Sequence, residues 1–144
     1  MSLNLSIEIE GEKQLSAKLL IAAGHIKDFS LPLAASAQEL IKSFDMNFDR
    51  RGAMFGGWVA RKKNYPWPLM EKTGRLRGGF YSHTGKEQAV VGNAMMDAYG
   101  KYHQSNQSRR KMPRRVFMEI DEARRNYIIK AFQRHIVEST RGLS

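Results

Sequence analysis

Alternation of apolar and polar residues predicts the strands of this chain. Near its start, polar residues separate four apolar positions, which predicts a strand that ends at Gly11: Leu3, Leu5, Ile7 and Ile9. The stretch from Arg75 to Tyr81 alternates again, and a turn built around Gly85 leads to a returning strand over 88–92. Two such runs joined by a turn predict a β-hairpin, which is the central local prediction.

Apolar residues at helical spacing predict helices before and after the hairpin. The first two helices are expected over 13–26 and 32–48, joined by a turn that Pro32 marks, as in an αα-hairpin. A short helix is expected over 95–102, and a short third strand over 114–118. The closing helix carries an apolar stripe that includes Tyr127, and Asp121 is its predicted N-cap.

The one-sided patterning of both kinds of element requires helices and strands to cover one another. We therefore predict a single α+β domain over 1–144. In it, two N-terminal helices and a C-terminal helix pack on one face of a small antiparallel sheet. Two stretches rich in glycine, proline or charge, 49–68 and 104–113, are predicted to be mobile loops, because they bury too little surface to offset the entropy of ordering.

The net charge of +10 is unevenly placed along the 144 residues. The stretch up to Asp45 carries −2, from six acidic and four basic residues, and the remainder carries +12. Such asymmetry favours a partner with negative potential, either a nucleic acid or an acidic protein surface. The alternative is a solvated basic face without a specific partner.

Residue types needed for common catalytic and metal sites are missing or scattered. The chain has no cysteine, which excludes disulfides, thiolate metal sites and cysteine nucleophiles. Its four histidines lack the paired spacing of metal ligands, and the glycines from Gly74 to Gly79 lack P-loop spacing. We therefore expect no enzyme activity, catalytic residue, metal or cofactor. No run of 18 apolar residues and no signal-peptide pattern is found, so we expect no membrane span and a cytosolic site of synthesis.

Basic residues lie beside aromatic residues in the first predicted loop. Trp58 and Trp67 are candidates for an aromatic anchor or for stacking on a single-stranded nucleic acid. The alternative is that they pack on the core, and we expect this of at least one of them. The densest cationic cluster follows Lys101, in a stretch that no acidic residue interrupts: Arg109, Arg110, Lys111, Arg114 and Arg115.

The order of these motifs resembles the phage virion morphogenesis, or tail-completion, family of tailed phages and prophages, which contains the phage Mu G-like and phage P2 S-like proteins. That family starts its hairpin with Thr-Gly-x-Leu-Arg, continues through a Tyr segment that runs into His-Gln, and has a last strand before the final helix. The matching residues in this chain are Thr73, Gly74, Leu76, Arg77, Tyr99, His103, Arg114 and Phe117. The resemblance covers roughly 45–136 and departs at Gly100, where the family usually has alanine.

The resemblance implies a structural protein that completes the tail end and joins the tail tube to the head–tail connector. It also implies a homo-oligomer, with a hexameric ring as the family expectation, located in the virion and in the host cytoplasm during assembly. The predicted partner contacts are Arg77, Arg109, Arg110 and Arg114, with Trp58 or Trp67 as the aromatic anchor. The alternative function is a nucleic-acid-binding module that uses the basic loops. Weak nucleic-acid contact is expected of a neck subunit too, since the genome passes through its ring.

Overall fold

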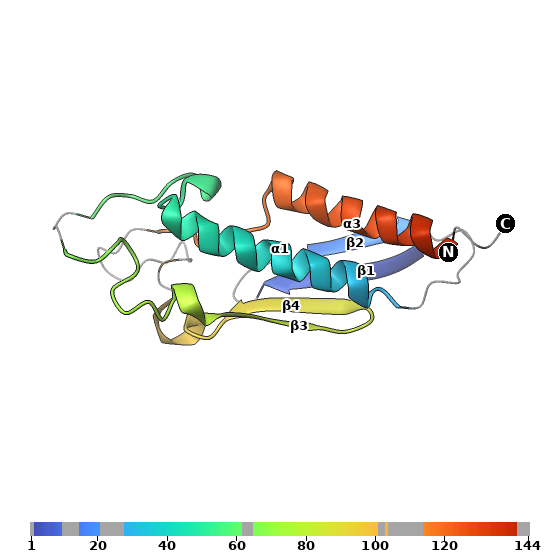
Figure 1. Ribbon diagram of the computed structural model, residues 1–144, viewed down its shortest axis with the longest axis horizontal. Coiled ribbons are helices and arrows are strands. Elements are labelled where there is room, and N and C mark those ends of the chain that lie inside the picture. Colours follow the sequence, from blue (N-terminus) through green and yellow to red (C-terminus); the bar gives the residue numbers. More distant parts are fainter. Residues whose placement is uncertain are drawn as a thin grey trace.

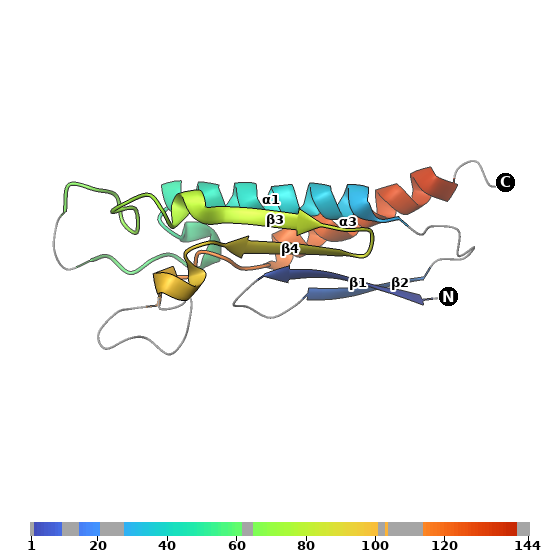
Figure 2. The ribbon, with the colours of Figure 1, turned by 90° about the horizontal axis from the view of Figure 1, so that it is seen from below.

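The computed structural model describes residues 2–9, 15–20, 28–61, 65–100, 103 and 114–140, with the backbone alone described for 2–9, 15–20, 97, 99 and 140. Within these residues, a four-stranded sheet carries two long helices on the same side (Figures 1 and 2). A long loop extends beyond the sheet at one end. The chain is therefore an α+β protein, as predicted.

The sheet has the strand order β2-β1-β4-β3. β1 (Ser2–Ile9) pairs antiparallel with β2 (Leu15–Leu20), where Ile7 lies opposite Leu15. On its other edge, β1 pairs in parallel with β4 (Gln88–Asn93). The strand predicted at the start of the chain is confirmed, but the sheet is mixed rather than antiparallel throughout.

The helix predicted over 13–26 is wrong, because residues 15–20 form β2. The sequence of this strand contains a period of two, since Leu15, Ala17 and Leu19 alternate with polar residues, alongside the leucine spacing that suggested a helix. Pairing with β1 satisfies the backbone groups along one edge of this segment and decides in favour of the strand. The predicted αα-hairpin is therefore not formed, because its first helix is replaced by β2.

β3 (Phe80–Thr84) and β4 form the predicted hairpin. The N–H of Gly85 donates to the Gln88 carbonyl oxygen at 2.7 Å and closes the turn. β3 begins later than predicted because Arg77–Gly79 form a 3-10 turn. After β4, a single π-helical turn at Met96–Gly100 lies within the range 95–102, where a short helix was predicted.

α1 (Ser30–Asp49) corresponds to the second predicted helix and supplies much of the core. The Asp28 carboxylate accepts the N–H of Ser30 at 2.8 Å and so satisfies a backbone donor at the start of the helix. The helix packs against α3, β3 and β4. Its buried apolar residues follow one face at helical spacing: Leu33, Ala37, Leu40, Phe44 and Phe48.

α3 (Glu122–Thr140) is the predicted closing helix. The Asp121 carboxylate accepts the N–H of Arg124 at 2.9 Å, which confirms the predicted cap. Phe132 is buried and lies against Phe29, with ring centroids 5.8 Å apart. No helix among the described residues is long and apolar enough to cross a membrane.

The strand predicted over 114–118 is wrong, since residues 114–120 have no regular secondary structure. Other segments satisfy the backbone groups of this stretch in place of a strand ladder. The N–H of Arg115 donates to the His103 carbonyl oxygen at 2.7 Å, and the Val116 carbonyl oxygen accepts the indole N–H of Trp58 at 2.7 Å. Phe117 and Met118 are both fully buried, whereas successive residues of a strand point to opposite faces.

Candidate partner-binding site at the loop end

The described segments 50–61 and 65–79 lie between α1 and β3 and extend away from the sheet at the left of Figures 1 and 2. Three structural features organise their residues: a tight turn that follows α1, an arginine bound by several carboxylates, and a cluster of cations and aromatic rings. We call this part of the molecule, together with His103 and Arg115, the loop end.

The turn after α1 holds Trp58 in the core. Gly52 has a φ of 78°, a conformation that favours glycine, and its α-carbon lies directly against the indole ring of Trp58. The indole N–H donates to the Val116 carbonyl oxygen at 2.7 Å, and the ring meets Phe48 edge-on with centroids 5.1 Å apart. Because Trp58 is only 9% exposed, its place in the core leaves Trp67 as the better candidate for the predicted aromatic anchor.

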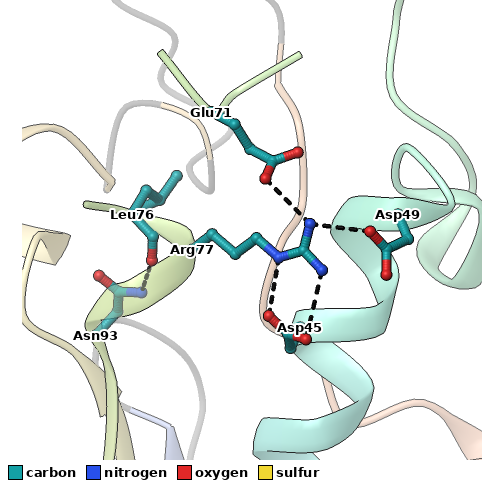
Figure 3. Close-up of polar contacts among 6 residues, drawn as sticks. All are labelled: Asp45, Asp49, Glu71, Leu76, Arg77 and Asn93. Atoms are coloured by element: carbon teal, nitrogen blue, oxygen red, sulfur yellow. Dashed lines mark hydrogen bonds and ion pairs between the residues drawn. The ribbon is translucent and has the colours of Figure 1, made fainter. Parts of the chain in front are cut away.

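Arg77 binds three carboxylates from two parts of the chain (Figure 3). Its Nε lies 2.8 Å from Asp45, and its Nη1 lies 2.9 Å from Asp49 and 3.0 Å from Glu71. The guanidinium also lies 5.8 Å from the ring centroid of Phe48. Arg77 therefore ties the end of α1 to the loop and to the start of the hairpin.

The same contacts shift the ionisation of these groups. Hydrogen bonds with Asp45 and Asp49 raise the pKa of Arg77, and the hydrogen bond from Arg77 lowers the pKa of the Asp49 carboxyl. The charge of Arg77 is thus offset within the molecule. Its predicted contact with a partner stays a prediction, and its observed place is that of a tether between elements.

Farther along the loop, cations flank an aromatic stack. The rings of Tyr65 and Trp67 are stacked, with centroids 4.8 Å apart and an interplanar angle of 11°. The Arg61 guanidinium lies 5.5 Å from the Tyr65 centroid, and the Lys72 ammonium lies 5.3 Å from the Trp67 centroid. Arg61 also donates to the carbonyl oxygens of Tyr65 and Trp67, at 3.1 and 2.6 Å. These four residues form one cation–aromatic cluster.

A hollow of about 360 Å³ lies beside this cluster. Its described lining combines apolar surface with cationic and polar groups: Trp67, Met70 and Leu76, and Lys72, Thr73, Arg75 and His103. Lys72 and Arg75 are both exposed, and no carboxylate is found among these lining residues. The hollow therefore presents positive charge next to an apolar surface.

The turn at Thr73 and Gly74 positions Arg75 at this hollow. Gly74 has a φ of 74°, and the Thr73 hydroxyl accepts the N–H of Arg75 at 3.3 Å. This arrangement is a short side-chain-closed turn of the kind that threonine favours. The Thr-Gly motif thus sets the direction of the chain directly before the hairpin.

Arg115 adds a buried positive charge near His103. Arg115 is 8% exposed, and its Nε donates to the Val59 carbonyl oxygen at 2.9 Å. Burial and the nearby charge of Arg61 lower the pKa of Arg115. Burial and the charge of Arg115 in turn lower the pKa of His103, which favours the neutral imidazole. The Nδ1 atom of His103 is buried, and no hydrogen-bond partner for it is found among the described residues.

Three residues from separate motifs meet in the core beneath the hairpin start. Leu76 is 2% exposed and Phe117 is fully buried. A β-carbon placed on Gly100 would lie 3.1 Å from the Phe117 ring and 3.3 Å from the Leu76 side chain. Asn93 holds this arrangement through a 2.6 Å hydrogen bond from its side-chain amide to the Leu76 carbonyl oxygen (Figure 3). A side chain at position 100 would therefore require small shifts of these neighbours.

Several residues predicted for the site lie outside the described part of the chain. These are Arg109 and Arg110, and the side chain of Tyr99. Arg114 is exposed at the start of the segment that leads to α3. Of the two loops predicted to be mobile, 104–113 lies outside the described residues, and the mobility of 49–68 stays a prediction.

Sequence reasoning did not select Arg61, Lys72, Arg75 and Arg115 as site residues. A usable signal was nevertheless available, because Arg61 and Lys72 flank the pair of aromatic residues Tyr65 and Trp67 within a dozen positions. The inclusion of His103 and Arg115 needs the fold, because they come from later segments of the chain.

A second hollow, of about 250 Å³, lies between α1 and α3 near the start of α1. Two exposed apolar residues line it, Leu31 at 73% and Tyr127 at 42% exposure. Its charged lining has both signs, with Arg134 and Glu138 among the residues. This surface differs in chemistry from the positive hollow at the loop end.

The described residues contain no group of three or more histidine, aspartate or glutamate side chains placed to hold a metal ion. The groups gathered at the loop end are cations, aromatic rings and hydrogen-bonding groups. This chemistry suits the recognition of a partner that carries negative charge.

No family model, curated protein or solved structure matches this chain.

Proposed function

We propose that this chain is a structural subunit of a phage or prophage virion, which completes the tail end and joins the tail to the head–tail connector. It acts as a homo-oligomeric ring, with six copies as the family expectation, and its partners are the tail tube and connector proteins. It is made in the host cytoplasm and ends in the virion. In this role it catalyses no reaction and needs no cofactor.

The convergence of the motif residues carries the proposal. Thr73 and Leu76 from the hairpin start and His103 from the Tyr segment line one hollow, and Phe117 from the last segment is buried in the same core as Leu76. These residues are far apart in the sequence. Their proximity in the structure supports the resemblance to the tail-completion family.

The two ends of α1 offer different surfaces for assembly. Leu31 and Tyr127 expose apolar surface near its start, and the positive hollow lies beyond its end. A ring built from identical subunits uses two different, complementary patches on each subunit. Apolar contacts supply much of the affinity in such interfaces, while complementary charge guides encounter and register.

The test is complementation of a phage or induced prophage from which this gene is deleted. We expect the deletion to leave filled heads and separate tails that do not join, or tails with defective ends, as seen by electron microscopy. A plasmid copy of the gene should restore infectious particles. Normal infectious particles from the deletion itself would refute the proposal.

The second candidate is a nucleic-acid-binding module. The observation that favours it is the gathering of four cations, Arg61, Lys72, Arg75 and Arg115, at the loop end. Such binding weakens steeply with salt, with a log–log slope of roughly one unit for each phosphate neutralised. Sub-micromolar, sequence-selective binding at physiological salt would favour this candidate over the virion subunit, which needs only weak contact with DNA.

A further inference from the structure

We propose that the positive hollow beside Trp67 binds an acidic, partly apolar peptide segment of a partner protein. This inference rests on the proposed function, because it names the chemistry of a surface that meets the subunit in the assembled virion. In it, Lys72 and Arg75 pair with carboxylates of the segment, and Trp67 and Met70 contact its apolar side chains.

The cations at the hollow remain available because the neighbouring acid is already bound. Glu71 is next to Lys72 in the chain, but its carboxylate lies 3.0 Å from Nη1 of Arg77. Glu71 is therefore held by the tether, and the described lining of the hollow has no carboxylate. A carboxylate from outside the subunit is the complementary group for this surface.

The interior of the hollow adds both polarity and apolar surface. His103, a half-buried side chain, lines it. Leu76 and Met70 line the same hollow, so the ligand needs apolar groups as well as charge.

The aromatic rings favour a peptide over a single-stranded nucleic acid. Binding of bases uses aromatic faces that are open for stacking. Here the rings of Tyr65 and Trp67 already lie against each other, and Arg61 and Lys72 lie over them. A base would compete with these contacts, whereas a carboxylate reaches Lys72 without separating the rings.

The experiment measures binding of three labelled probes to the full chain by fluorescence anisotropy at physiological salt. The first probe is a synthetic decapeptide of alternating acidic residues and leucine, and the second replaces its acids by glutamine and asparagine. The third is an oligothymidylate of the same net charge as the acidic peptide.

The test variant is Lys72→Glu with Arg75→Glu, and a second variant carries glutamine at both positions. The matched control is Arg125→Glu with Lys130→Glu, two exposed residues of α3.

We expect the acidic peptide to bind more tightly than the other two probes. Its affinity should fall about tenfold or more in the Lys72/Arg75 glutamate variant and less in the glutamine variant, because only the former adds repulsion. The control should change it by less than about twofold. Circular dichroism spectra should be unchanged, since both substituted residues are exposed.

Three results would overturn the inference: no binding of the acidic peptide, an equal loss in the α3 control, or tighter binding of the oligothymidylate through Lys72 and Arg75. The last result would assign the hollow to nucleic acid. These outcomes are separate from the complementation test. A deletion that leaves heads and tails unjoined, combined with no peptide binding, would remove this inference and leave the proposed function in place.

Discussion

Gly52 and Trp58 illustrate how one backbone position determines the course of the loop. The φ of 78° at Gly52 turns the chain after α1, and the absence of a side chain there lets the indole of Trp58 approach the backbone. From that position the indole reaches the Val116 carbonyl oxygen. Two tryptophans of the same loop therefore have different roles, with Trp58 in the core and Trp67 at the hollow.

Substitution of Gly52 by alanine should lower the free energy of unfolding by about 2–4 kcal/mol, because alanine is strained in the left-handed conformation and its β-carbon would overlap the Trp58 ring. The matched control is Gly57→Ala. Gly57 also has a positive φ, of 86°, but the space around it is open. The control should lower the free energy of unfolding by only about 1–2 kcal/mol, because it introduces the conformational strain without the overlap. Urea denaturation measures both, and equal losses would show that contact with Trp58 contributes nothing.

His103 should make stability depend on pH. Its folded-state pKa lies below the ordinary value of 6.5, so the unfolded chain takes up the proton first as the pH falls. The stability contributed by the neutral imidazole is therefore fully present above pH 6.5 and is lost as the pH falls through the lower folded-state pKa. In His103→Asn, the temperature of thermal unfolding should change less with pH across this range than in the unsubstituted chain. In the control His83→Asn, at an exposed position of β3, the change of unfolding temperature with pH should stay the same.

At the scale of elements, Arg77 joins three parts of the chain. It connects Asp45 and Asp49 of α1 with Glu71 of the loop, and it is itself part of the turn before β3. An isolated ion pair near the surface contributes little, but a planar guanidinium that binds several carboxylates also fixes their relative positions.

Arg77→Met keeps an apolar chain beside Phe48 and removes the charge. We expect it to lower the free energy of unfolding by about 1–2 kcal/mol, since several carboxylates lose their partner at once. Arg124→Met is the control, because among the described residues Arg124 pairs with one carboxylate, that of Asp121, at 2.8 Å. The control should cost at most about 1 kcal/mol. A loss in Arg77→Met no larger than in the control would argue against a tether.

For the whole molecule, hydrogen bonding divides the long loop into two parts. Between Arg50 and Trp58, most backbone N–H groups donate within the turn or back to α1. After Trp58, the described backbone bonds are sparse, with Glu71 bonded to Pro68 and Arg75 to the Thr73 hydroxyl. Protection from solvent exchange should follow this division.

We therefore expect amide hydrogen exchange to be slower over 50–58 than over 65–75, by about tenfold or more. This narrows the mobility predicted for 49–68 to the second part of the loop. Exchange measured by mass spectrometry or nuclear magnetic resonance resolves the two parts within one sample. Equal, fast exchange throughout would mean that the turn around Gly52 opens as readily as the rest.

Local patterns determined several elements without help from the fold. Alternation identified β1 and the β3–β4 hairpin, and helical spacing identified α1 and α3, because each of these segments favours one period over its whole length. The cap at Asp121 also follows from sequence, since it needs only a side chain and a backbone N–H three residues later. Trp67 was identified as a site residue for the same kind of local reason, its position among basic and aromatic neighbours.

The tertiary structure decided what depends on partners distant in the chain. Residues 15–20 carry patterns of both a helix and a strand, and pairing with β1 selected the strand. Residues 114–118 alternate, but Trp58 and His103 satisfy their backbone groups outside any sheet. The same holds at the loop end, where Arg77 meets its carboxylates and His103 joins Lys72 and Arg75 around one hollow. Hydrogen bonds, ion pairs and burial depend on which groups meet in space, and the periodicity of a sequence contains only local spacing.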